Sequence, residues 1–252
     1  MTDKPIPIDT SVPLDLHPDA LLPHADTFAV EGVPGKMGLE LGRAALAEMH
    51  DSYGKIARAA KAIQDTEHSI VSTPAGLRMG RADLEPLVAA AKAAFDRTAN
   101  AVDARIRSLE AERTDLTKRL DATLTEPSKS AIGIAQASEI RSHLRSLEPA
   151  KAMTVAMDAM RAGDRMTAAA ILTAPAYLSG LDAAKHGELR KLAASTLEPN
   201  VDKALTALDK ISDHVKRATQ SYVGMYAKVT QAANAGPSSK VRAALKELHN
   251  AA

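Results

Sequence analysis

Apolar residues recur every seven positions in three long segments of the chain. In the first segment the steps alternate between three and four, through Leu46, Met49, Tyr53, Ile56, Ala60 and Ile63. The second segment has the row Val88, Phe95, Val102, Leu109 and Leu116, and the third has Val201, Leu208, Val215, Tyr222 and Val229. This spacing is typical of helices that pack through a coiled-coil seam. We therefore predict three long helices, and no strand, because β-branched residues nowhere alternate with polar ones.

Breaks in this pattern divide the chain into four parts. We expect an extended arm at 1–35, a long helical hairpin at 36–125, a cluster of short helices at 126–198, and a long helix followed by a short terminal helix at 199–252. The hairpin is expected to be antiparallel because only a short Ser-Thr-Pro-Ala-Gly break joins its two helices. The predicted fold is all-α, with coiled-coil-like seams between the long helices.

Prolines and short polar residues mark where the helices are expected to begin. Asp83 is the expected N-cap of the second long helix, with Pro86 in its first turn. The short helices are expected to begin at Ser128 or Ser130, Pro149, Asp164 and Asp182, and Gly163 is expected to close the second of them. Pro199 should begin the third long helix, and a short helix is expected at 240–249.

The first 35 residues differ from the rest in proline content and charge. Six of the 13 prolines lie here, and six acidic residues against a single base, Lys4, leave a net charge of −5. Dense prolines remove backbone donors and favour extended backbone. The arm is not a polar linker, because apolar residues recur through it. We expect these residues to lie in a groove of a partner, and the charge to steer the arm toward a basic surface.

Two sets of apolar residues are the candidate interface. The arm contributes Ile6, Ile8, Val12, Leu14, Leu16, Phe28 and Val30, and the second long helix contributes Val88, Phe95, Val102, Leu109 and Leu116. Long helices with few aromatic residues leave apolar rows that one chain does not cover, so partner helices or copies of the same chain are expected to cover them. Arg113 interrupts the second-helix pattern and is expected to extend its guanidinium to the edge of the seam rather than to set the register.

Composition narrows the class of protein further. The chain has 252 residues, a net charge of +1, no Cys and no Trp. The lack of Cys excludes a disulfide scaffold, an iron–sulfur cluster, a Cys-based zinc site and a Cys nucleophile. The 50 alanines, about a fifth of the chain, are typical of a helix-on-helix core. The near-neutral charge argues against a basic protein that wraps nucleic acid.

No catalytic, metal or cofactor motif stands out. None of the eight His residues has the spacing of a helical zinc motif, and each is expected at the surface or half-buried. The Gly-rich turn at 32–38 lacks the spacing of a phosphate loop, and Met37 replaces its hydroxyl. We therefore predict no catalytic residue, no cofactor and no small-molecule substrate. Basic clusters leave contact with DNA possible but unsupported, because acidic residues are interspersed.

The chain has no segment suited to a membrane. The longest uncharged run, Met166–Leu181, has 16 residues and is broken by Pro175 and Gly180, whereas a spanning helix needs about 20 apolar residues. The N-terminus lacks the basic and apolar regions of a secretory signal. We expect a protein made and kept in a cytoplasm.

The segment Arg161–Leu181 resembles helical proteins that are encoded among the structural genes of tailed phages and prophages. The similarity lies in Gly163-Asp164, the Ala-rich helix, Ala174-Pro175 and the Leu-Ser-Gly-Leu run at 178–181. It covers about 21 residues, includes no catalytic residue, and implies a virion or assembly setting. The expected function is then a non-enzymatic structural or assembly protein of a tailed-phage particle, made in the host cytoplasm. It would dock to a capsid, portal or tail surface through its arm. The alternative is a helical adaptor or regulatory module of the bacterial cytoplasm, unrelated to virions.

Overall fold

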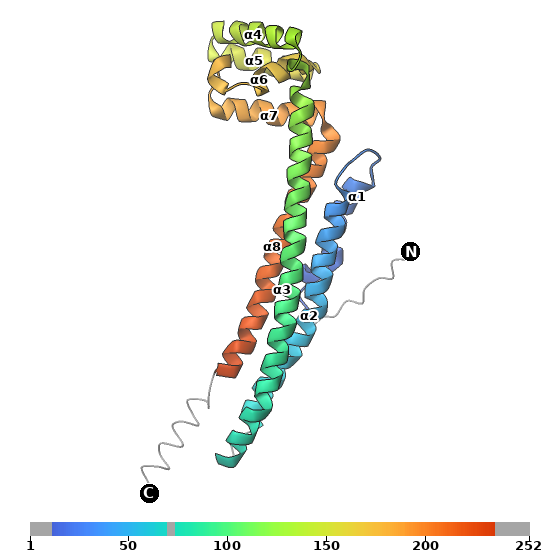
Figure 1. Ribbon diagram of the computed structural model, residues 1–252, viewed down its shortest axis with the longest axis vertical. Helices are drawn as coiled ribbons and strands as arrows, with labels where there is room; N and C mark the ends of the chain where they lie inside the picture. The colour runs from blue at the N-terminus through green and yellow to red at the C-terminus, as the bar shows by residue number, and fades with distance from the viewer. Residues whose placement is uncertain (1–11, 70–73, 235–252) are drawn as a thin grey trace, which may run out of the picture. The chain divides into compact units, whose positions relative to one another are not determined.

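The computed structural model describes the backbone of residues 12–69 and 74–234 and the side chains of residues 12–63 and 85–233 (Figure 1). Within these ranges the chain forms eight α-helices and four 3-10 helices, and no strand. The predicted all-α fold is confirmed, and long helices are present. Ile6, Ile8 and the short helix expected at 240–249 lie outside the described residues.

The elements follow one another in this order: η1 (Leu14–Leu16), η2 (Pro18–Leu21), α1 (Leu22–Ala29), α2 (Lys36–Ser69), α3 (Pro74–Thr125), η3 (Glu126–Ser128), α4 (Ala131–Ser146), α5 (Pro149–Arg161), α6 (Arg165–Leu172), η4 (Ala176–Ser179), α7 (Ala183–Leu197) and α8 (Pro199–Asn234). The letter η marks a 3-10 helix.

The prediction of an extended arm is wrong for residues 14–29. This segment forms η1, η2 and α1 in succession. Pro18 is the first residue of η2, and Pro23 is the second residue of α1. A proline at the start of a helix loses no hydrogen bond, and its fixed φ already suits the helix. The same prolines that predict extended backbone therefore also fit short helical turns.

The second long helix begins earlier than the sequence predicted. Helix α3 starts at Pro74 rather than near Asp83, and Pro86 lies inside it. Both prolines suit a first turn, so local chemistry alone does not decide which of them begins the helix. The long helix at 199–234 begins at Pro199 as predicted.

The short helices begin at the predicted residues. Ser130, Asp164 and Asp182 are N-caps whose side chains accept hydrogen bonds from backbone amides, and Pro149 is the first residue of α5. Gly163 has a φ of 83°, a left-handed conformation that glycine adopts without the strain other residues would suffer. Cap chemistry in the sequence therefore located these helices.

The chain divides into two compact units, and we describe each separately. Unit 1 comprises residues 1–23, 40–109 and 211–252, and unit 2 comprises residues 24–39 and 110–210. In unit 1, α2 meets α8 through a hydrogen bond of 2.8 Å between Ser52 Oγ and Tyr222 Oη. Phe95 of α3 stacks on Tyr226 of α8, with ring centroids 4.2 Å apart. These contacts assemble α2, α3 and α8 into a bundle.

The core of unit 2 forms around the short helices. α4, α5, α6 and α7 gather at the C-terminal end of α3 (Figure 1). Their shared core is made of Leu, Ile, Met and Ala side chains, among them Leu120, Leu124, Leu144, Met160, Ile171, Leu189 and Leu197. Small alanines between these residues let the helices approach closely, as expected for an Ala-rich sequence.

Candidate interaction surface

The structure divides the predicted arm residues into two groups. Val12, Leu16 and Phe28 are buried against the chain itself. Leu14 and Val30 are 71% and 54% exposed. The expectation that all of these residues bind a partner is therefore wrong for the buried three, because burial within the chain already satisfies them.

Residues 12–23, which we call the strap, are attached to α2 and α8 by polar contacts within unit 1. His214 Nε2 donates to the backbone carbonyl of Asp15 at 2.8 Å, and Ser221 Oγ donates to Asp15 Oδ2 at 2.9 Å. Arg43 Nη2 lies 3.5 Å from Asp19 Oδ1. From the sequence we expect the negative charge of the arm to act on a basic partner. The carboxylates of Asp15 and Asp19 instead contact side chains of their own chain.

The surroundings of Tyr53, a residue of α2, change the pKa of its hydroxyl. Burial, and to a lesser extent the negative charge of Asp15, raise the pKa of its hydroxyl. The phenol therefore stays protonated and neutral at physiological pH. Its neutrality suits a buried position on the apolar row of α2.

The strap also contains a histidine that sequence reasoning placed at the surface or half-buried. His17 is only 6% exposed, and it packs edge to face against His50 of α2, which is 9% exposed, with ring centroids 5.3 Å apart. The expectation for these two histidines is wrong. Neither lies on an apolar row, so no local pattern indicates that packing of the strap on α2 buries both rings.

The apolar row predicted on the second long helix is buried only in part. Val102, Leu109 and Leu116 are buried, whereas Val88 and Phe95 are half-buried. Helices of the same chain cover the buried members, so these residues belong to the core and not to a free interface. Phe95 also stacks on Tyr222, with ring centroids 5.4 Å apart.

Arginine–carboxylate pairs brace the helices within each unit. In unit 1, Arg105 Nε of α3 donates to Glu48 Oε1 of α2 at 3.1 Å. In unit 2, Arg113 of α3 pairs with Asp209 of α8, and the hydrogen bond and charge of this carboxylate raise the pKa of Arg113. The Arg113 side chain is about half exposed, as predicted for a guanidinium at the edge of the seam.

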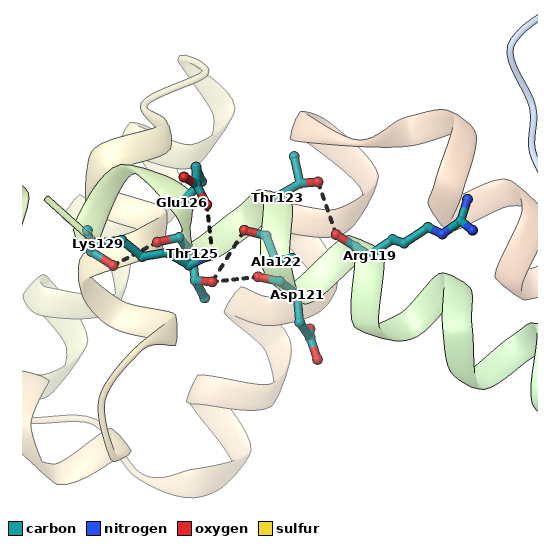
Figure 2. Close-up of polar contacts among 8 residues, drawn as sticks. Arg119, Asp121, Ala122, Thr123, Thr125, Glu126 and Lys129 are labelled. Atoms are coloured by element: carbon teal, nitrogen blue, oxygen red, sulfur yellow. Dashed lines mark hydrogen bonds and ion pairs between the residues drawn. The ribbon is translucent and has the colours of Figure 1, made fainter.

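The end of α3 is held by local polar contacts (Figure 2). Thr125 Oγ1 donates to the carbonyl of Asp121 at 2.7 Å, and Thr123 Oγ1 donates to that of Arg119 at 3.0 Å. In the following turn, Lys129 Nζ lies 2.7 Å from Glu126 Oε2. Each contact links residues three or four apart, so this cluster fixes the turn between α3 and α4 rather than forming a site for a ligand.

Unit 2 exposes apolar side chains that sequence reasoning did not single out. Ile132 of α4 and Tyr177 of η4 are 74% and 70% exposed. A groove of about 330 Å³ also lies between α4 and α5, lined by Glu139, Ile140, His143, Leu144, Val155, Ala159 and Thr167. The only signal in the sequence was that Ile132 lies off the face formed by Gly133, Ala137 and Leu144, which is buried.

The described residues contain no group of three or more His, Asp or Glu side chains placed to hold a metal ion. In the same part of the chain, no helix is both long and apolar enough to cross a membrane. Comparisons with protein-family models, with curated proteins and with solved structures gave no match. The fold is all-α, and several arginine–carboxylate pairs join neighbouring helices within each unit.

Proposed function

We propose that this protein is a non-enzymatic structural or assembly component of a tailed-phage particle. The proposal begins from the similarity of Arg161–Leu181 to helical proteins of phage structural genes. In this segment Asp164 caps α6, which is buried along most of its length, and Gly180 ends η4 in a left-handed conformation. The segment thus serves packing within unit 2, as a structural module requires.

The use of polar side chains supports a structural role. Arg105, Arg113 and Arg190 each pair with a carboxylate on another helix, at Glu48, Asp209 and Asp121 respectively. These charged side chains join neighbouring helices within each unit. Such bracing favours a rigid component that presents a fixed surface.

The observation that supports docking through the arm is the exposure of Leu14 and Val30. Val12, Leu16, Leu21 and Phe28 of the described arm are buried against the chain, but Leu14 and Val30, together with Leu22, remain exposed. Exposed apolar side chains gain free energy when a partner covers them. We therefore assign each of them to contact with a capsid, portal or tail protein, or with another copy of this chain.

Quantitative mass spectrometry of purified particles tests this role. We expect peptides of this protein in a fixed ratio to those of the major particle proteins. Leu14→Ser and Val30→Ser, made separately, should each lower incorporation by about tenfold, which corresponds to about 1.4 kcal/mol of lost contact. Met37→Ser is the matched control, because Met37 is also exposed and apolar but lies outside the arm.

The possible outcomes separate the parts of the proposal. If both arm variants incorporate like the control, docking through the arm is wrong while the particle role stands. If the protein is absent from particles but present in the cell extract, the alternative of a cytoplasmic helical adaptor replaces the whole proposal.

A further inference from the structure

Two buried histidine rings join the strap to α2 without satisfying all of their nitrogen atoms. His17 comes from the strap and His50 from α2, and the rings meet edge to face. The Nε2 atoms of both rings are buried, and neither has a hydrogen-bond partner among the described residues. A buried polar atom without a partner costs free energy, so it calls for an explanation.

The hydrogen bond at the other nitrogen of His17 fixes its protonation state. The backbone N–H of Asp19 donates to His17 Nδ1 at 3.2 Å, where the ring caps η2. A backbone amide can only donate, so Nδ1 must be unprotonated and the ring must be neutral with its proton on Nε2. A nitrogen that carries a proton cannot bind a metal, so Nε2 of His17 in this state is not a metal ligand.

Protonation of His17 would therefore remove a hydrogen bond that maintains the folded conformation of the strap. A proton on Nδ1 would face the amide proton of Asp19, and the cap of η2 would be lost. The new charge would be buried beside the ring of His50. If His50 also gained a proton, two buried positive charges would lie on rings whose centroids are 5.3 Å apart.

The charged and titratable groups around the pair do not offset this cost. Asp19 Oδ2 lies 3.6 Å from His17 Nδ1, but the same carboxylate is shared with Arg43. Asp51 Oδ1 lies 3.5 Å from His50 Nδ1, but the Asp51 side chain is 76% exposed, where water screens its charge. The remaining groups are neutral or act elsewhere on the strap: Tyr53 on α2, His214 on α8 and Asp15 on the strap.

We propose that the strap is a pH-sensitive latch, closed while His17 and His50 are neutral and released when they take up protons. Histidine is the side chain that ordinarily changes charge between about pH 5 and pH 8, so a test of the latch spans this range. His214 is not part of the switch, because its Nε2 can donate to the carbonyl of Asp15 in either charge state. This inference does not depend on the proposed function.

Release would uncover apolar surface on unit 1. Leu16 and Leu21 are fully buried in the closed state, and Leu21 lies against Gly42 beside Ile211 of α8. An open strap would expose this surface of α2 and α8 to a partner. The latch would thus couple a fall in pH to the presentation of a new apolar binding surface.

Hydrogen exchange on the full chain tests the latch. The amides of Leu16, His17, Asp19 and Ala20 are all hydrogen-bonded within the strap, so opening would remove their protection. After correction for the intrinsic effect of pH on exchange, we expect strap protection to fall at least about tenfold between about pH 7.5 and pH 5.5. Uptake of two protons permits up to about 100-fold per pH unit. Protection of α5 in unit 2 should stay constant and serves as the internal reference.

Substitutions at the two histidines separate the latch from general acid effects. In His17→Asn the side-chain oxygen can still accept from Asp19 N but does not titrate, and His50→Gln removes the second titrating ring. The double variant should keep its strap protection constant over this pH range. His214→Gln and the surface control His143→Gln should keep the wild-type response.

Three results would overturn the proposal. Wild-type protection that is constant would show that the strap does not respond to protons. Protection that rises in acid would show that the ion pair of His17 with Asp19 prevails. A double variant with the wild-type slope would assign the response to other groups. If the double variant does not fold, the single variant His50→Gln is the test. The latch requires that the pH dependence of its strap protection correspond to about one proton fewer than in the wild type.

Discussion

At the scale of single residues, α2 approaches both α8 and the strap closely at Gly42, because glycine has no Cβ. A Cβ at Gly42 would lie 2.5 Å from Ile211 Cγ2 and 3.0 Å from Leu21 Cδ1. These distances are below any ordinary contact between carbon atoms. Gly42 therefore lets α2 meet both α8 and the strap. Gly42 lies seven residues before Met49 of the apolar row, but this spacing does not explain why the residue must be small.

We expect Gly42→Ala to destabilise the protein by about 1 to 3 kcal/mol, because the added methyl group overpacks this contact. The matched control is Gly224→Ala in α8, where a Cβ would meet nothing within 4 Å. That change should stabilise by about 0.5 to 1 kcal/mol, since alanine favours helix more than glycine does. Urea denaturation of both variants measures the difference. Equal shifts would mean that α2 and α8 are not in close contact at Gly42.

The two faces of α3 should respond differently to a new negative charge. Val102 is buried in unit 1, whereas Arg107 is exposed on the same helix. Val102→Asp should cost about 3 kcal/mol or more, because it buries an unpaired carboxylate. Arg107→Asp should change stability by about 0.5 kcal/mol or less. Thermal melts would contradict the assignment of faces if the two variants shifted alike.

At the scale of elements, side-chain hydrogen bonds cap the starts of three short helices of unit 2, which are α4, α6 and α7. Asp164 Oδ1 accepts from the amides of Met166 and Thr167 at 2.9 and 3.0 Å, and Oδ2 accepts from Thr167 Oγ1 at 2.6 Å. Burial raises the pKa of Asp164, but these hydrogen bonds outweigh burial and hold the pKa below its usual value. The carboxylate form is therefore the one that stabilises α6.

We expect Asp164→Ala to lower the free energy of unfolding by about 1 kcal/mol at neutral pH, the usual cost of a lost N-cap. A lowered pKa in the folded state means that the contribution is present above about pH 4 and is lost as the pH falls through the folded-state pKa. The difference from the wild type should therefore shrink in acid. Asp164→Asn is the control that retains an oxygen acceptor, and denaturation at several pH values is the measurement. A difference that grew in acid would contradict the role of the carboxylate.

At the scale of the whole molecule, the N-terminal residues belong to the folded core. Leu16 and Leu21 are fully buried in unit 1, and Phe28 is buried in unit 2. The sequence pattern predicted that the helical body begins at residue 36 and that the preceding arm contacts a partner. The burial of these three side chains contradicts the basis of that expectation.

Deletion of residues 1–33 should therefore lower the melting temperature. Three buried apolar side chains contribute at least about 1.5 kcal/mol each. A loss of 1 kcal/mol shifts Tm by about 2 to 4 °C in a chain of this size, so we expect a decrease on the order of 10 °C. Calorimetry of the full and truncated chains measures the shift. Leu14→Ser is the control, since this exposed side chain should leave Tm almost unchanged. A truncated chain with the wild-type Tm would restore the view that the arm serves only partners.

The candidate interface was predicted less well than the fold. Val12, Leu16 and Phe28 were correctly recognised as apolar side chains that need a surface, but whether that surface lies in the same chain or in another is not encoded in their spacing. The row through Val102, Leu109 and Leu116 was recognised as a seam, and the structure covers it with helices of the same chain. Ile132 and Tyr177 were missed because isolated apolar residues of short elements belong to no periodic pattern.

The sequence by itself determined that the described chain is helical from residue 36 onward and where most of those helices begin. Periodicity and capping act between residues within a few positions of one another, so they can be read along the chain. Only the tertiary structure decided what the N-terminal segment contacts, because its contacts join residues far apart in the sequence. Asp15 meets His214 across 199 positions, and His17 meets His50 from another element. Such pairs depend on how the elements pack, and no local pattern specifies them.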